Sequence, residues 1–106
     1  MTMKTAEMKQ ILFEKLQAEN CYFSKSDISI RKDGNGYKII IADYEHIIFT
    51  IKLETDSEFN NAEEMTLWTQ HKDSKHKNLL MLEESHSDKT MKDILIYLGY
   101  YIGTRF

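Results

Sequence analysis

The feature that most restricts the fold of this chain is a β-hairpin signal in residues 28–41. Apolar and polar side chains alternate on both sides of a short turn-forming sequence, Asp33-Gly34-Asn35-Gly36. Asp-Gly and Asn-Gly pairs tolerate the positive φ angles that a tight hairpin turn requires. The side chains expected on the apolar face are Ile28, Ile30, Tyr37, Ile39 and Ile41. The pattern therefore predicts two antiparallel strands joined by a tight turn.

The alternation continues after a short link, so a third strand should lie beside the second. The side chains expected on its apolar face are Ile47, Phe49, Ile51 and Leu53. Because the link Asp43–His46 is short, the second and third strands should be neighbours and antiparallel. The apolar face of these three strands needs a cover, and the helices are the candidates for it.

The segment 54–70 allows more than one structure. Residues 57–64 fit a loop, and they also fit a short helix that opens at one of the two asparagines. Residues 65–70 contain strand-forming side chains, although they also show a helical spacing, and we favour a strand. After the charged loop at 71–77, residues 78–84 predict a further strand. These last two strands would form a second hairpin that extends the sheet.

An apolar stripe at helical spacing predicts a helix near each end of the sequence. The first helix spans Thr5–Glu19, and Asn20 is a plausible stop signal. The second follows Ser87, whose hydroxyl can cap it, with Asp88 in the first turn, where the helix dipole favours an acid. The apolar stripe of the second helix consists of Met91, Ile94, Leu95, Leu98, Tyr101 and Ile102.

These elements predict a single α+β domain over residues 1–106. It has an N-terminal helix, an antiparallel β-meander of four to five strands and a C-terminal helix packed on the sheet. In the C-terminal helix, Gly99 and Gly103 should allow close approach to the sheet, or Gly103 should end the helix. A dimer contact is the weaker alternative. The flank 97–101 is also apolar, so we expect a monomer or a weak homodimer through this helix.

Composition and charge exclude several classes of protein. The 106-residue chain has a net charge of −3, so it lacks the basic balance of a general nucleic-acid-binding protein. It has no apolar run like that of a signal peptide, and no stretch close to the roughly 18 apolar residues of a membrane span. Its single cysteine, Cys21, cannot form an internal disulfide and fits a buried or half-buried position in a reducing compartment. We therefore expect a cytoplasmic protein.

No catalytic, metal-binding or cofactor-binding motif stands out. The histidines within residues 71–86 show no recognised ligand spacing, and lysines in the same loop would repel a cation, so we interpret these histidines as solvated. Glu83, Glu84 and Asp88 are close in sequence, but neighbouring residues on a strand point to opposite faces. We predict no catalytic residue, no metal and no cofactor. A small metal-dependent nuclease that uses these acids and nearby histidines is the enzymatic alternative.

The one functional lead is an acidic segment, residues 43–64. It holds seven carboxylates against a single base, Lys52, a balance of −6, whereas the rest of the chain carries +3. The carboxylates are Asp43, Glu45, Glu54, Asp56, Glu58, Glu63 and Glu64. The strand between them should place the first two at one rim of the sheet and the others at the opposite rim. Tyr44 and Phe59 lie in the same segment, and exposed aromatics often anchor interfaces.

In size, composition and absence of catalytic motifs, the chain resembles the small inhibitors encoded by phages and mobile elements, anti-CRISPR proteins among them. The resemblance implies a protein that works by occupying the surface of another protein. Spaced carboxylates can imitate a line of phosphates and attract a basic cleft.

We therefore predict a non-enzymatic module for a partner protein with a basic, nucleic-acid-binding cleft, without direct contact to nucleic acid or membrane. Its binding residues would be the seven carboxylates with Tyr44 and Phe59. A solvated surface that only maintains solubility is the alternative for the acids. A dimerising structural or regulatory subunit is a further alternative for the protein.

Overall fold

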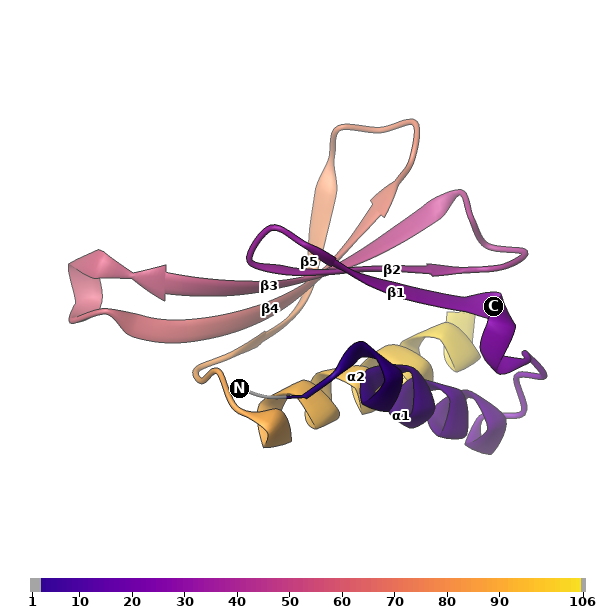
Figure 1. Ribbon diagram of the computed structural model, residues 1–106. Coiled ribbons are helices and arrows are strands. Elements are labelled where there is room, and N and C mark those ends of the chain that lie inside the picture. The colour runs from indigo at the N-terminus through magenta and orange to yellow at the C-terminus, as the bar shows by residue number, and fades with distance from the viewer. Residues whose placement is uncertain (1–2, 106) are drawn as a thin grey trace.

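The computed structural model describes residues 3–105 and confirms the α+β meander that the sequence predicts (Figure 1). The elements in chain order are α1 (Thr5–Ala18), the 3-10 turn η1 (Lys25–Asp27), β1 (Ile28–Asp33), β2 (Gly36–Ile41), β3 (Ile47–Asp56), the 3-10 turn η2 (Ser57–Phe59), β4 (Ala62–His71), β5 (Lys77–Glu83) and α2 (Asp88–Arg105). The five strands form one antiparallel sheet in the order β1-β2-β3-β4-β5, so each strand pairs with its neighbours in sequence.

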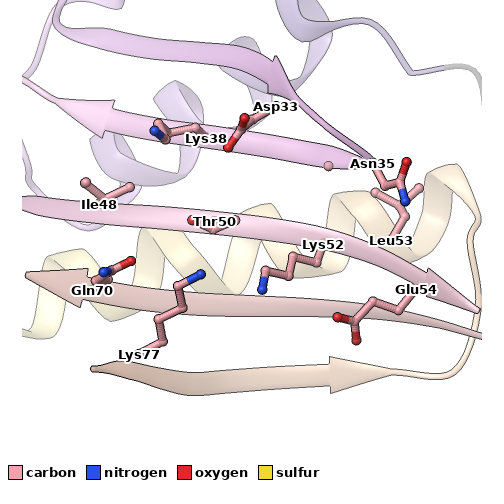
Figure 2. Close-up of a pocket in the computed structure, with 11 residues that line it drawn as sticks. Asp33, Asn35, Lys38, Ile48, Thr50, Lys52, Leu53, Glu54, Gln70 and Lys77 are labelled. Carbon is pink, nitrogen blue, oxygen red and sulfur yellow. The ribbon is translucent and has the colours of Figure 1, made fainter. Parts of the chain in front are cut away.

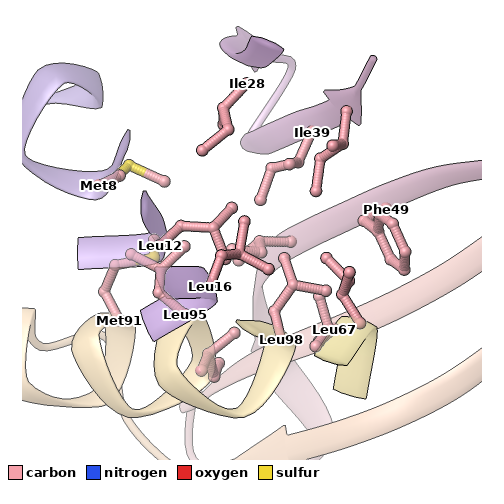
Figure 3. Close-up of a cluster of buried hydrophobic side chains, with 14 of the residues drawn as sticks. Met8, Leu12, Leu16, Ile28, Ile39, Phe49, Leu67, Met91, Leu95 and Leu98 are labelled. Atoms are coloured by element: carbon pink, nitrogen blue, oxygen red, sulfur yellow. The ribbon is translucent and has the colours of Figure 1, made fainter. Parts of the chain in front are cut away.

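Both helices lie side by side on one face of the sheet, and the core fills the space between them and the strands (Figures 1 and 3). The helices contribute Met8, Leu12, Leu16, Met91, Ile94, Leu95, Leu98 and Ile102. The strands contribute Ile28, Ile39, Ile41, Phe49, Ile51, Met65 and Leu67. These are the apolar positions that recur with the 3.6-residue period along the helices and with the two-residue period along the strands. The opposite face of the sheet has no helix over it (Figure 1).

The β1–β2 turn depends on two glycines for different reasons. Gly34 adopts a φ of +59°, the left-handed conformation that a tight hairpin loop demands. Gly36 is buried and stands directly opposite Lys52 on β3. A Cβ atom added to Gly36 would overlap the carbonyl oxygen of Ile51 and lie 2.9 Å from its carbonyl carbon. Gly36 therefore permits β2 and β3 to approach at this point.

Replacement of Gly36 by alanine should lower the free energy of unfolding by about 1–3 kcal/mol, because backbone atoms of β3 cannot rotate away from the new methyl group. Gly34→Asn is the matched control, since its surroundings are open and asparagine tolerates positive φ. Thermal or denaturant unfolding of both variants measures the effect. Equal stabilities for the two variants would contradict the close approach of β2 and β3.

The glycines of α2 face α1, which corrects the prediction that they face the sheet. A Cβ at Gly99 would lie 2.9 Å from the Cβ of Lys15, and one at Gly103 would lie 2.6 Å from the Cβ of Glu19. Gly103 also does not end the helix, which continues to Arg105. The small residues bring the two helix backbones together, so that both helices fit on one sheet face. Periodicity alone does not reveal which neighbour a glycine faces.

The start of α2 agrees with the sequence prediction. The backbone N–H of Thr90 donates a hydrogen bond of 3.1 Å to the Ser87 hydroxyl, which therefore caps the helix. Of the helices within residues 3–105, none has both the length and the apolar character needed to cross a membrane.

The middle of the chain forms a long β-hairpin, which resolves the uncertainty over residues 54–70. The predicted strand at 65–70 exists, but β4 begins earlier, at Ala62. Instead of the alternative short helix, η2 is followed by Asn60 and Asn61 with φ angles of 56° and 58°. Asparagine enters this left-handed region more easily than most residues. These two residues return the chain into β4, and the β3–β4 hairpin projects beyond the helices (Figure 1).

Candidate functional site

The β3–β4 hairpin brings together five of the seven carboxylates of the acidic segment. We define the acidic hairpin tip as Glu54, Asp56, Glu58, Glu63 and Glu64, together with Phe59. The other two acids, Asp43 and Glu45, are exposed in the loop between β2 and β3, at the opposite end of β3. The structure therefore divides the predicted binding residues into two separate groups, as the strand geometry predicts.

Four carboxylates of the tip surround one open cavity. Glu54 on β3 stands directly opposite Glu64 on β4. Asp56 follows Glu54 by two residues and therefore shares its face of the hairpin. With Glu58 from η2, these acids line a cavity of about 620 Å³, whose other residues are Asn35, Leu53, Thr55 and Ser57. The cavity is a concentrated acidic site that is open to solvent.

The carboxylates of the tip have no ion-pair partner within the described part of the chain. None of its five carboxylates forms an ion pair with a Lys, Arg or His among residues 3–105; the ion pair found there joins Lys15 to Glu19 at 2.7 Å, in α1 and the turn that follows it. Like charges directly opposite each other on neighbouring strands destabilise a hairpin. The pair Glu54–Glu64 therefore carries a cost within the folded chain, and a cation from outside would relieve it.

The geometry of the tip is held by short-range contacts. The backbone N–H of Glu58 donates a hydrogen bond of 2.9 Å to Oδ1 of Asp56, so this carboxylate caps η2. Phe59 at the end of η2 is 68% exposed. A large aromatic ring at the projecting end of a hairpin has few intramolecular contacts to lose on mutation. It is therefore available to a partner.

The β4 side of the acidic hairpin tip is braced by His86, from the loop between β5 and α2. His86 is half-buried, and its Nε2 lies 2.7 Å from the carbonyl oxygen of Glu64, to which it donates a hydrogen bond. Its backbone N–H donates to Oε2 of Glu63 at 3.2 Å. The prediction of a solvated histidine is therefore wrong for His86, whereas His71 and His76 are exposed. No local pattern indicates a contact with residues 22 positions away.

Tyr44 is placed differently from Phe59. It is half-buried, packs against the core and makes an edge-to-face contact with Phe23 at a ring-centroid distance of 5.9 Å. The rings of His46 and then His71 continue this row, at centroid distances of 6.5 and 5.6 Å. Tyr44 thus contributes to packing at the β2–β3 end of the molecule. Phe59 is the more accessible of the two aromatic residues predicted to bind a partner.

The structure also places the residues that were considered for metal binding and for thiol chemistry. Among residues 3–105, no three His, Cys, Asp or Glu side chains are grouped so that they could hold a metal ion. The Cys21 thiol is half-buried, as predicted, and burial, with a smaller contribution from the Glu19 carboxylate, raises its pKa. A raised pKa leaves less of the reactive thiolate at neutral pH.

The flank of α2 that was proposed as a dimer contact is partly occupied. Tyr97 and Tyr101 pack against the core, and the ring of Tyr101 meets Phe49 edge to face at 6.2 Å. Ile96 and Tyr100 are exposed, at 37% and 50%. The apolar surface that α2 offers to another molecule is therefore limited mainly to these two side chains.

Searches against protein-family models, curated proteins and solved structures return no significant match to this chain.

Proposed function

We propose that this protein is a small non-enzymatic binding module whose acidic hairpin tip occupies the basic, nucleic-acid-binding cleft of a partner protein. The observation that carries the proposal is the cavity lined by Glu54, Asp56, Glu58 and Glu64, none of which is paired with a cation of the described chain. Lysine or arginine side chains of a partner would supply the missing positive charge.

The shape of the hairpin supports insertion into a cleft. The tip projects beyond the helices (Figure 1), so a cleft can enclose it without displacing the core. Its carboxylates occur on both strands and on η2, which gives an array of negative charges on a backbone held by the β3–β4 ladder. Such an array can replace the phosphates of a nucleic acid in a basic channel.

The general resemblance to small inhibitors of phages and mobile elements gives this binding a biological setting. We propose that the protein acts in the cytoplasm as an inhibitor of a nucleic-acid-handling enzyme, of the anti-CRISPR or another anti-defence kind. Competition with nucleic acid would then be the mechanism, since the tip and the phosphate backbone would use the same cations of the partner. The inhibitor itself would need no catalytic residue or cofactor.

Phe59→Ala should weaken binding to such a partner by about tenfold or more, because exposed aromatic anchors often become buried hot spots in interfaces. The melting temperature should hardly change, since Phe59 is 68% exposed in the free protein. Tyr22→Ala is the control, because Tyr22 is 89% exposed but lies outside the hairpin. Titration calorimetry with the purified partner measures both variants. Equal losses for Phe59→Ala and Tyr22→Ala would remove Phe59 from the interface.

Affinity capture from a bacterial lysate tests the function itself. The bait proteins are the natural chain, the tip variant E54Q/D56N/E58Q and a control variant, E7Q/E14Q/D93N, with the same charge change at exposed helix positions. We expect the natural chain and the control variant to recover a basic nucleic-acid-binding protein, and added duplex DNA to compete with this recovery. The tip variant should not recover it. Recovery of the same protein by all three baits would contradict the proposal.

A further inference from the structure

The face of the sheet opposite the helices has a charge pattern of its own. In one row across it, Lys38 on β2 stands opposite Thr50 on β3, which stands opposite Trp68 on β4. In the next row Lys52 stands opposite Thr66, and at the edge of the sheet Lys77 stands opposite Gln70. Cations from three strands therefore share a surface that neither helix covers.

All three of these cations line one cavity on this face (Figure 2). The cavity measures about 310 Å³ and is lined by Lys38, Lys52 and Lys77, with Thr50 and Gln70 between them. The side chains of Lys52 and Lys77 point toward each other across the strands in Figure 2. Ile48 and Leu53 add apolar surface to the wall.

The three lysines of the cavity outnumber its two carboxylates, and within the described chain they form no ion pair with them. Asp33 and Glu54 also line the cavity, but neither forms an ion pair with a lysine among residues 3–105. Lys52 instead lies over the ring of Trp68, with its Nζ 5.4 Å from the ring centroid. Lys38 and Lys52 are both half-buried, so their charges are less well solvated than those of freely extended lysines. Ammonium groups brought together in this way favour the binding of an anion.

We propose that this cavity binds a small phosphate-bearing ligand of the size and chemistry of a mononucleotide. The phosphate would lie between Lys52 and Lys77, where the Thr50 hydroxyl can donate a further hydrogen bond. The carboxylates of Asp33 and Glu54, which also line the cavity, would accept hydrogen bonds from the hydroxyl or amino groups of the same ligand. The volume is at the lower end of the roughly 300–1,000 Å³ typical of small-molecule pockets. A compact ligand fits these dimensions better than an extended strand.

The site is separate from the acidic hairpin tip in its chemistry, although Glu54 belongs to the walls of both cavities. The proposal rests on Lys38, Lys52 and Lys77 and does not depend on any partner of the tip. The variant K52M/K77M leaves all five carboxylates of the tip in place, whereas E54Q/D56N/E58Q changes Glu54, which belongs to both cavity walls, so the lysine variant is the one that tests this site by itself.

The fluorescence of Trp68, the single tryptophan of the chain, reports on the site through Lys52, which lines the cavity and lies over the tryptophan ring. The full-length protein is titrated with AMP, GMP, CMP and UMP, with inorganic phosphate, and with adenosine as the ligand that lacks phosphate. We expect saturable binding of at least one mononucleotide at micromolar to roughly millimolar concentration, competition by inorganic phosphate and no binding of adenosine.

The double variant K52M/K77M should weaken mononucleotide binding by roughly tenfold or more, the effect of losing charge-assisted hydrogen bonds. The control K89M/K92M removes the same charge from exposed positions of α2 and should bind like the natural chain. Circular dichroism melting of both variants checks that they fold, and NMR chemical-shift mapping replaces fluorescence if K52M alters Trp68 itself.

Three results would overturn the proposal. The first is the absence of saturable binding by every mononucleotide and by phosphate. The second is an equal loss in K52M/K77M and K89M/K92M, which would indicate non-specific charge attraction. The third is a much tighter binding of single-stranded oligonucleotides that increases with their length, which would identify an extended nucleic-acid surface instead of a small-ligand site.

Discussion

A chain that ends before Leu95 is expected to lose cooperative folding completely. The deletion removes Leu95, Leu98 and Ile102, which are at most 1% exposed in the folded protein. Burial of each such side chain contributes roughly 1.5–3 kcal/mol, whereas the total stability of a domain is about 5–15 kcal/mol. Differential scanning calorimetry of the shortened chain should therefore show no unfolding transition.

Two full-length variants make this prediction specific to the buried stripe of α2. Leu98→Ala should lower the free energy of unfolding by about 2–5 kcal/mol, the usual range for a large-to-small change in a core. Tyr100→Ala, on the exposed flank of the same helix, should change it by no more than about 0.5 kcal/mol. A cooperative melt of the shortened chain would show that α2 is an appendage and that α1 and the sheet form a complete core without it.

Neutralising the acidic hairpin tip should weaken partner binding severalfold or more while leaving the fold intact. In E54Q/D56N/E58Q, three carboxylates become amides of nearly the same shape, and the asparagine at position 56 can still accept the hydrogen bond from the Glu58 N–H. Removal of the repulsion between Glu54 and Glu64 should offset small losses, so the free energy of unfolding should change by less than about 0.5 kcal/mol. Affinity for the basic partner should fall severalfold or more, mainly through a slower association rate.

The control for this variant is E7Q/E14Q/D93N, which has the same net charge but an unchanged tip. If it loses as much affinity as the tip variant, the overall charge of the protein governs binding and the tip has no special role. A large fall in the melting temperature of the tip variant would instead mean that Glu54, Asp56 and Glu58 brace the hairpin. Surface plasmon resonance and thermal unfolding together separate these outcomes.

The elements of the fold could be predicted because their signals are local. The turn at Asp33–Gly36 and the alternation on either side of it depend on neighbouring residues, and so does the apolar stripe of α2. The start of β4 was not foreseen, since Ala62–Glu64 are acidic or small and resemble a loop. They become strand only because Asn60 and Asn61 turn the chain and place these residues opposite β3.

The sequence shows which segment contains the candidate site, but it does not show which residues of the site lie close together in space. The surplus of acid in residues 43–64 is visible in the sequence, and strand geometry separates Asp43 and Glu45 from the tip. The opposition of Glu54 and Glu64 depends on the register of β3 and β4, which no single segment encodes. The same is true of the contact of His86 with Glu64 and of the lysines from β2, β3 and β5, because tertiary structure brings them together.

The salt dependence of association with the captured partner tests most directly whether the acidic hairpin tip is the binding surface. Stopped-flow association rates would be measured over a series of ionic strengths for the natural chain and for E54Q/D56N/E58Q. Charge steering is screened within about 8–10 Å at physiological salt. The rate for the natural chain should therefore fall steeply as salt increases, and the rate for the tip variant should be lower and nearly independent of salt. Equal rates and equal slopes for the two proteins would contradict the account and leave these carboxylates as charges that only maintain solubility.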